Sequence, residues 1–321
     1  MIYLNETDIL NVGVDWRALI PTIEKSVAGL RENDYSQPLK VYLRFHEPVN
    51  RIIAMPAYLG GEFNISGVKW IASFPNNIVN KVPRAHSVVI LNETQSGIPV
   101  AILNTGLLSV IRTCAVSGFF LKMVTNARKF ASINLGIIGF GPIGQYHLKM
   151  CSAFFGDRIA RVRIYDVRKL DAGHVDFDPC KVVLSESWES VYEESDVLIT
   201  ATVASTPYIG LCPRAGSVHL NISLRDYSAD VHPYFKDSII VDDWDEVCRE
   251  KTTIELMARE KGLKKEHTVS LKDSTLADFL ARVPVAAPIM FNPMGMAVFD
   301  MAIASHYMKK SVENGVGQLL T

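Results

Sequence analysis

A glycine-rich turn between an apolar strand and a helix is the feature that most constrains the fold. The segment LGIIGFGPIG places Gly139, Gly141 and Gly144 in the spacing G-x-G-x-x-G, and the apolar run before it predicts a buried strand over residues 134–139. A helical pattern follows the turn, and the next predicted strand ends in Asp166, 22 residues beyond Gly144. This context predicts a Rossmann βαβ unit rather than an isolated glycine turn.

The same turn predicts a site for a dinucleotide. In this motif the first glycine permits a tight turn, the second lets a pyrophosphate approach the backbone, and the third lets helix and strand pack closely. The free amides at the helix N-terminus then face the phosphate groups. We expect the pyrophosphate to be bound by the loop residues Gly139, Gly141, Pro142, Ile143 and Gly144.

Three further side chains are candidates for cofactor binding. Asp166 at the end of its strand is placed to accept the ribose hydroxyls, which favours NAD over NADP, although the nearby Arg168 leaves room for a 2′-phosphate. Thr202 and Ser223 follow two later strands, at the carboxyl edge where ligands bind in open α/β sheets. For either hydroxyl alone, a bond to the loop backbone is the simpler interpretation.

The hydrophobic period changes along the chain and predicts two domains. Residues 1–112 combine an amphipathic helix capped by Asp15 with alternating strands over 37–45, 51–58, 65–73, 87–92 and 99–104. Residues 113–295 alternate helices, beginning with 113–126, with strands over 134–139, 161–166, 196–203, 217–223 and 238–241. A final helical pattern over 295–309 is expected to return to the first domain, which then comprises 1–112 with 296–321. The predicted fold class is α/β, a Rossmann doubly wound parallel sheet plus an α+β domain.

Composition excludes several functional classes. Lys plus Arg number 33 and Asp plus Glu 34, so the net charge of −1 gives no reason to expect nucleic acid or an anionic membrane as partner. Five widely spaced cysteines without a CxxC pair indicate neither a zinc site nor a disulfide framework. The N-terminus lacks a secretory pattern, and the apolar stretch 283–304 is broken by prolines and Asp300. A cytoplasmic enzyme or binding protein is the expectation.

The first domain places cations inside apolar strands. Lys40, Tyr42 and Arg44 alternate along one predicted strand, Lys69 lies in SGVKWIAS, and Arg112 ends the run ILNTGLLSVIR. An arginine can bind a carboxylate through two parallel hydrogen bonds, and a desolvated lysine can transfer protons. Beside a dinucleotide site, this set indicates a substrate with one or more carboxylates. For each cation alone, a structural ion pair is the alternative.

Two acids after the later strands complete the candidate list. Asp226 and Asp230 stand near the same sheet edge, and for Asp230 we prefer a solvated loop position. The acids around Asp242 match a strand end and a helix start rather than a metal site, since no histidine stands at ligand spacing.

Longer motifs carry a family resemblance. The segments RIIAMPAYLGG, SGVKWIASFPNN, GIPVAILNTGLLSVIRTCAVS, GIIGFGPIGQYHL and FNPMGMAVFD resemble the ornithine cyclodeaminase/μ-crystallin family over nearly the whole chain. The resemblance implies a homodimer in which the N-terminal part and the final helix form a dimerisation and substrate domain. It also implies carboxylate binding by Arg44 and Arg112, proton chemistry at Lys69 and a polar or acid–base role at Asp226. Arg84, in KVPRAHS, falls in a matching segment.

A branch of the family implies the reaction, on the segments QPLKVYLR, ATVASTPYI, NISLRD and VDDWDEVCREKTTI. NAD⁺ removes hydride from the α-carbon of a glutamate whose nitrogen carries a 2-amino-2-carboxyethyl group, and hydrolysis of the imine releases 2-oxoglutarate and L-2,3-diaminopropionate. Diaminopropionate feeds siderophores and antibiotics, and an unidentified synthase must supply the conjugate.

Sister activities remain open: an ornithine cyclodeaminase, an alanine dehydrogenase, a ketimine reductase, or a non-catalytic binding protein of the crystallin type. The presence of Lys69 and of the arginines favours an enzyme.

Overall fold

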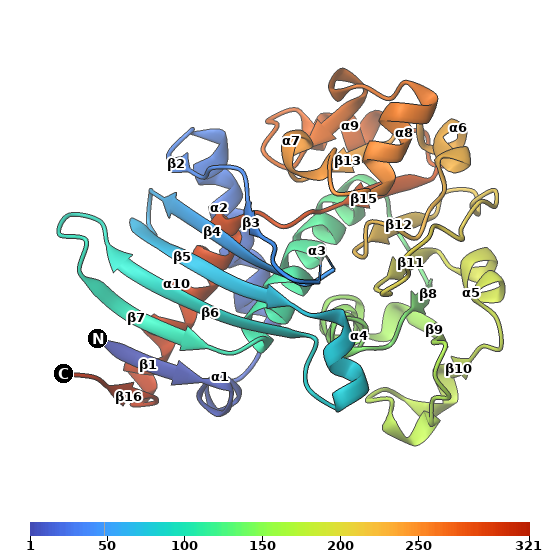
Figure 1. Ribbon diagram of the computed structural model, residues 1–321. Coiled ribbons are helices and arrows are strands. Elements are labelled where there is room, and N and C mark those ends of the chain that lie inside the picture. Colours follow the sequence, from blue (N-terminus) through green and yellow to red (C-terminus); the bar gives the residue numbers. More distant parts are fainter. Residues whose placement is uncertain (48) are drawn as a thin grey trace. The chain divides into compact units, whose positions relative to one another are not determined.

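The chain forms two compact units in the computed structural model, which describes residues 1–47 and 49–321 (Figure 1). Unit 1 comprises Met1–Val116 and Gly295–Thr321, and unit 2 comprises Ser117–Met294. The chain passes from one unit to the next inside helix α3 (Leu107–Ala127). This helix begins well before the predicted start at residue 113, because the Thr105 hydroxyl accepts the Leu107 N–H (3.0 Å) and starts the helix there.

Unit 1 is built on a mixed sheet with the strand order β16-β1-β7-β6-β5-β4-β2, in which β3 also pairs with β4. The pair β1–β7 is parallel and the neighbouring pairs are antiparallel. Its strands are β1 (Ile2–Asn5), β2 (Tyr35–Ser36), β3 (Val41–Leu43), β4 (Arg51–Leu59), β5 (Ile65–Ser73), β6 (Ala85–Glu93), β7 (Pro99–Asn104) and β16 (Gln318–Leu319).

Helices cover one face of this sheet. Besides the short α1 (Glu6–Val12), they are α2 (Trp16–Arg31) and α10 (Ala297–Asn314), which pack on each other, and α10 lies against β4, β5 and β6. In Figure 1 α10 is drawn in red and crosses behind the sheet. The predicted cap of α2 is confirmed, since the Asp15 side chain accepts the Arg17 N–H (2.9 Å). Its apolar stripe, including Ile23 and Val27, is fully buried.

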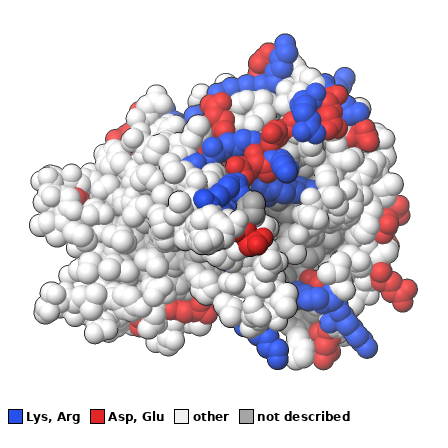
Figure 2. Space-filling view, viewed as in Figure 1, with Lys and Arg blue, Asp and Glu red and all other residues white. Residues whose placement is uncertain are grey.

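The other face of the sheet carries apolar side chains that no helix of unit 1 covers in Figure 1. Side chains alternate along a strand, and the register pairs Val68 with Ile90, Trp70 with Val88, and Ile90 with Ile102. We call Val68, Trp70, Val88, Ile90 and Ile102 the open face. Trp70 is 45% exposed, and Figure 2 shows few charged side chains over these strands.

Unit 2 is built on a parallel sheet with the order β10-β9-β8-β11-β12-β15-β13-β14, which is the predicted doubly wound architecture. Its strands are β8 (Ile133–Ile138), β9 (Ile159–Tyr165), β10 (Val182–Leu184), β11 (Val197–Thr200), β12 (Val218–Asn221), β13 (Ile239–Val241), β14 (Thr268–Ser270) and β15 (Ile289–Asn292). Strand order reverses between β8 and β11, so the loops after these strands meet at the edge where such sheets bind ligands.

Short helices connect the strands of unit 2. They are α4 (Pro142–Phe155), α5 (Trp188–Glu194), α6 (His232–Phe235), α7 (Trp244–Val247), α8 (Thr253–Lys261) and α9 (Leu276–Arg282). The 3₁₀ helices are η1 (Pro75–Asn80) in unit 1 and η2 (Gly156–Arg158), η3 (Ala172–His174), η4 (Pro179–Lys181), η5 (Ala229–Val231) and η6 (Lys265–His267) in unit 2.

One strand prediction requires correction, and several short strands, β15 among them, were not predicted. The strand expected over residues 37–45 contains only Val41–Leu43, so Lys40 and Arg44 flank β3 and Tyr42 alone of the three lies within it. The inner strand β15 was not predicted, because its four residues lie in a proline-rich apolar stretch without a period of its own.

Candidate functional site

The glycine turn of unit 2 is shaped by backbone contacts that exclude side chains. Gly139 has φ +91°, and its N–H donates to the Tyr165 carbonyl (2.8 Å). A Cβ at Gly144 would lie 2.2 Å from the Gly139 carbonyl oxygen, so α4 packs directly on the turn. A Cβ on Gly139 would lie 2.6 Å from the Ala201 carbonyl oxygen. Both positions therefore require glycine for close packing.

Gly141 differs from these two because it borders open space. It is the N-cap of α4, Pro142 and Ile143 form the first turn, and a Cβ built on Gly141 meets no atom within 4 Å. Glycine is not needed there for packing in the protein alone. Helix α4 has 14 residues, and the space beside Gly141 at its N-terminus is open. The pyrophosphate of a dinucleotide could therefore approach the backbone there.

Asp166, directly after β9, is a carboxylate held in its ionised form. Its side chain is 7% exposed and accepts the Phe140 N–H (2.7 Å), the Arg168 N–H (2.9 Å) and two guanidinium contacts from Arg168 (2.9 Å each). Burial raises its pKa, but the hydrogen bonds from Arg168 and Phe140 outweigh burial and lower it to about 2. Asp166 therefore offers a fixed negative charge beside the glycine turn.

Thr202, Ser223 and Asp226 meet at the carboxyl edge of β11 and β12. The hydroxyls of Thr202 and Ser223 both donate to the Asp226 carboxylate, which is fully buried. Leu224 has φ +65° and turns the chain between Ser223 and Asp226. Burial raises the pKa of Asp226, and the hydroxyls offset this only in part. The buried Asp226 carboxylate thus orients the side chains of Thr202 and Ser223.

Unit 1 holds a buried group of three charges. Lys69 lies on β5 and Arg112 on α3, and both bind Asp300 of α10. Lys69 Nζ and Arg112 Nε each donate to Asp300 Oδ1 at 3.0 Å, and Lys69 Nζ also donates to Ser109 Oγ (2.7 Å). The exposed fractions of the side chains are 2% for Lys69, 8% for Arg112 and 0% for Asp300. We call these three residues the charge triad.

Burial controls the protonation of the lysine in this triad. Burial lowers the pKa of Lys69, and the Asp300 carboxylate opposes this by raising the pKa. The cations Arg112 and Lys40 lower the pKa further, so that it lies at about 8. Lys69 therefore exchanges a proton near neutral pH, as a general acid or base requires.

Arg112 is fixed by its surroundings. Its Nε is bound to Asp300, and a Cβ on Gly295 (φ +86°) would lie 2.7 Å from its Nη1. The guanidinium is thus clamped between a carboxylate and a glycine, and its terminal nitrogens are the part that can bind a substrate carboxylate.

The remaining predicted cations of unit 1 differ in burial. Lys40 is buried (8% exposed), Arg44 is exposed, and Arg84 is partly buried just before β6. Arg44 Cζ lies 5.3 Å from the centre of the Tyr42 ring, and Arg51 Cζ lies 5.6 Å from it. The register pairs Tyr42 with Ile53 and Met55 with Lys69, so Tyr42 and Arg51 share the face of Lys69.

Sequence reasoning missed two of these residues. Asp300 was noted only as a charge in an apolar stretch, although an acid in the helix GMAVFDMAIA requires a buried partner. Arg51 was treated only as the start of a strand. In contrast, Asp230 is the exposed loop acid that was expected, with 74% of its side chain exposed and Lys261 as its partner (2.7 Å).

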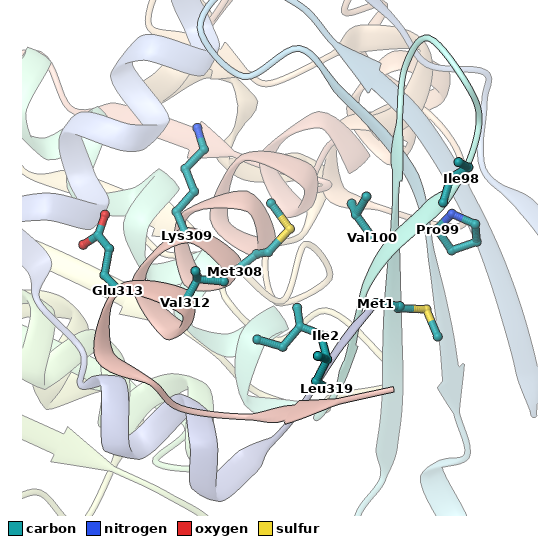
Figure 3. A pocket seen from close by; sticks show the side chains of 10 residues that line it. All are labelled: Met1, Ile2, Ile98, Pro99, Val100, Met308, Lys309, Val312, Glu313 and Leu319. Atoms are coloured by element: carbon teal, nitrogen blue, oxygen red, sulfur yellow. The ribbon is translucent and has the colours of Figure 1, made fainter. Parts of the chain in front are cut away.

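Other features of the molecule lie away from these residues. A hollow of about 570 Å³ in unit 1 is lined by Met1, Ile2, Ile98, Pro99, Val100, Met308, Lys309, Val312, Glu313 and Leu319 (Figure 3). Within residues 1–47 and 49–321, no three His, Cys, Asp or Glu side chains are grouped to hold a metal ion. Helix α3 has the length and apolarity of a membrane span, but 72% of its most apolar window is buried, as in a core helix.

Comparison with known proteins places this geometry in a family. The model of the ornithine cyclodeaminase/mu-crystallin family matches residues 7–315. The chain is 33% identical over 336 aligned positions to N-((2S)-2-amino-2-carboxyethyl)-L-glutamate dehydrogenase of Staphylococcus aureus (strain NCTC 8325 / PS 47), covering 100% of this chain and 98% of that protein. Because this relative is a dehydrogenase and matches the chain over its full length, the chain is an oxidoreductase.

Solved structures share the fold. Thermococcus litoralis Delta(1)-pyrroline-2-carboxylate reductase in complex with NADH and L-proline has a TM-score of 0.89 at 22% identity, with 100% of both chains covered. An archaeal alanine dehydrogenase dimer with bound NAD has a TM-score of 0.83 at 22% identity, covering 100% of this chain and 99% of that one. The family model spans both units and, together with the 33% identical relative, identifies the chain as a member of the ornithine cyclodeaminase/mu-crystallin family.

Proposed function

We propose that the protein catalyses the NAD-dependent oxidative cleavage of N-(2-amino-2-carboxyethyl)-L-glutamate to L-2,3-diaminopropionate and 2-oxoglutarate. The observation that carries the proposal is the charge triad. It puts a lysine that titrates near neutral pH next to a fixed arginine, which suits a carboxylate-bearing amine. The 33% identity over the full chain to the staphylococcal enzyme supports this choice of substrate.

The residues of unit 1 are assigned to the substrate. Arg112 and Arg44 bind carboxylates of the substrate, which carries three carboxylates. Lys40 and Arg84 add positive charge around it. Fixing the carboxylates also fixes the direction of the reacting C–H bond, which contributes through proximity and orientation. Lys69 accepts a proton from the water that attacks the ketimine carbon and returns one to the departing amine.

The residues of unit 2 are assigned to the cofactor, which is NAD and supplies the hydride acceptor. The glycine turn binds the pyrophosphate through Gly139, Gly141 and Gly144 with the first turn of α4, and Asp166 accepts the ribose hydroxyls. Thr202 and Ser223 line the nicotinamide end. Asp226 belongs to the reaction as the buried acid that orients these two hydroxyls.

We further propose that the protein is a homodimer joined through the open face of unit 1. The five apolar side chains of the open face lie side by side in the register, and a contiguous exposed apolar patch marks an interaction surface. The archaeal alanine dehydrogenase of the same fold is described as a dimer. Trp70→Glu is expected to give monomers by light scattering, whereas Val167→Glu, at an 88% exposed position of unit 2, should leave the dimer intact. A monomeric wild-type protein contradicts the assignment.

The proposed setting is the cytoplasm, where an upstream synthase provides the amine conjugate and the diaminopropionate product enters siderophore or antibiotic synthesis. The buried state of helix α3 is consistent with a protein that does not use this helix to span a membrane.

The proposal is tested by incubating the purified protein with NAD⁺ and the conjugate, while NADH absorbance and 2-oxoglutarate are measured. NADH and 2-oxoglutarate in equal amounts are expected with the conjugate alone. Ornithine and alanine are the parallel substrates. Proline formed from ornithine without net NADH would instead assign a cyclodeaminase, and NADH formed from alanine would assign an alanine dehydrogenase.

A further inference from the structure

We propose that Asp300 is a positioning residue of the reaction: it holds Lys69 and Arg112 in a fixed arrangement and matches their charge. This inference rests on the proposed function for its substrate but not for its geometry. Asp300 is the carboxylate of a helix that returns to unit 1 after the whole of unit 2, so it joins residues that are 188 and 231 positions away in the sequence.

The contacts of Asp300 are concentrated on these two side chains. Oδ1 accepts from Lys69 Nζ and from Arg112 Nε, both at 3.0 Å. The other oxygen, Oδ2, is buried and has no hydrogen-bond partner among the residues that the structure describes. A buried carboxylate is normally satisfied by several donors, so this one has been placed for its charge rather than for a complete set of hydrogen bonds.

Counting charges shows what this placement does. With Lys69 protonated the triad carries one net positive charge, and with Lys69 neutral it carries none. A substrate carboxylate on Arg112 adds one negative charge, so the bound state is neutral when Lys69 is protonated. Low-polarity surroundings favour the neutral combination. Asp300 therefore lowers the charge that a protonated Lys69 leaves in the triad from two to one, and a carboxylate on Arg112 lowers it to zero. Both anions favour the protonated lysine.

The electrostatics of the free protein agree with this count. The charged groups that face Lys69 are Asp300 from α10, Arg112 from α3 and Lys40 from the segment before β3. Burial and the two cations lower the pKa of Lys69, and Asp300 is the one of these groups that raises it. Without Asp300, Lys69 would lose its proton at a lower pH.

The test compares Asp300→Asn with the wild-type protein through the pH dependence of kcat/KM. Asparagine keeps the shape of the side chain but removes its charge. The limb of the pH profile of kcat/KM that reflects the titration of Lys69 is therefore expected to move to lower pH by about 1 to 3 units. kcat is expected to fall as well. Ser109→Ala is the matched control, because it removes another hydrogen bond of Lys69 without changing any charge, and its limb should move less.

A second variant and a second measurement separate position from stability. Asp300→Glu retains the charge on a longer side chain, so its limb should stay near the wild-type pH while kcat falls. The Lys69 ammonium can also be titrated directly by NMR in the free protein, using Lys69→Met to assign the signal. This titration needs no substrate, so it tests Asp300 even if the conjugate is not the substrate.

Each outcome has one meaning. The inference is supported if the Lys69 limb of the pH profile and the NMR titration of Lys69 both shift in Asp300→Asn and neither shifts in Asp300→Glu. An unshifted Lys69 titration in a folded Asp300→Asn protein overturns it. Equal shifts in Asp300→Asn, Asp300→Glu and Ser109→Ala also overturn it, since they would show a general effect of repacking.

Discussion

The two units each bury an aspartate completely, and they surround the two carboxylates with opposite chemistry. Asp300 in unit 1 is bound by a lysine and an arginine, whose charges overcome the effect of burial and lower its pKa. Asp226 in unit 2 accepts hydrogen bonds from the hydroxyls of Thr202 and Ser223. These, together with Thr200 and the charge of Arg225, do not overcome burial, so its pKa is raised. Two cations that donate hydrogen bonds directly to a buried carboxylate hold it ionised, whereas the hydroxyl donors and Arg225 at Asp226 leave that carboxylate easier to protonate.

This difference separates the work of the two units. Unit 1 holds buried fixed charges around Lys69, which the proposed function assigns to a charged substrate. Unit 2 keeps its glycine turn, Asp166 and a set of oriented hydroxyls, which suit a dinucleotide. A variant that removes a group from one unit should therefore disturb one function and leave the other measurable.

The largest expected effect comes from Lys69→Ala. Loss of the group that transfers protons should lower kcat by about 10²- to 10⁴-fold. The dissociation constant of NAD should stay within twofold or so of wild type, because the assigned cofactor residues all belong to unit 2. Stopped-flow absorbance and quenching of protein fluorescence by NAD measure the two quantities.

Lys25→Ala is the control for Lys69→Ala, since Lys25 is a solvent-exposed lysine of the same unit that pairs with Glu62. It should change neither quantity. Turnover that survives in Lys69→Ala would remove Lys69 from the proton transfer.

Thermal stability should distinguish the two buried aspartates. Asp300→Asn leaves two buried cations without a counter-charge and should cost about 3 kcal/mol at pH 6, and less at pH 9, where Lys69 has shed its proton. Asp226→Asn replaces an acid whose charged form is disfavoured, so the loss at neutral pH should be smaller or absent. Unfolding in urea at several pH values measures both.

The pH dependence of these variants has opposite signs. Asp300 has a lowered pKa, so its stabilising effect is present above the unfolded value of 3.8 and is lost as pH falls through the folded value. Asp226 has a raised pKa, so the wild-type protein loses stability as pH rises from 3.8 through the folded value. Asp226→Asn should remove that loss. An identical pH response in the two variants would refute the contrast between the units.

The glycine turn offers a comparison within unit 2. Gly144→Ala would push a Cβ to 2.2 Å from the Gly139 carbonyl and should destabilise the unit by about 1 to 3 kcal/mol. Gly141→Ala meets no atom within 4 Å, so the protein should fold normally but bind NAD much more weakly. Calorimetry with and without NAD measures both effects. If Gly141→Ala binds NAD normally, the pyrophosphate does not approach Gly141.

The sequence was informative where a local pattern has one physical meaning. The Gly139–Gly144 spacing with an apolar strand before it predicts the turn and the parallel sheet, and the step of apolar residues predicts α2 with Asp15 as its cap. The placement of Thr202, Ser223 and Asp226 at one edge of the sheet follows from the rule for parallel strands.

The pairing of distant charges was not available from any local pattern. Lys69 and Arg112 each looked like an isolated cation in an apolar segment, and their shared partner Asp300 lies more than 180 residues later. The length of β3 was also misjudged, because alternation over residues 37–45 continues beyond the part that pairs with β4. Both errors arise where tertiary contacts, rather than local periodicity, decide the structure.

The smallest expected effect, and the sharpest for cofactor choice, comes from Asp166→Ala. Loss of a carboxylate that accepts ribose hydroxyls should weaken NAD binding by about tenfold or more. Arg168, now released from Asp166, is placed to accept a 2′-phosphate, so NADP should bind better than before relative to NAD. Titration of both dinucleotides into Asp166→Ala and into the double variant Asp166→Ala/Arg168→Ala separates the two contributions. The gain for NADP should vanish in the double variant, whereas an unchanged ratio of the two affinities in Asp166→Ala would place the ribose away from Asp166.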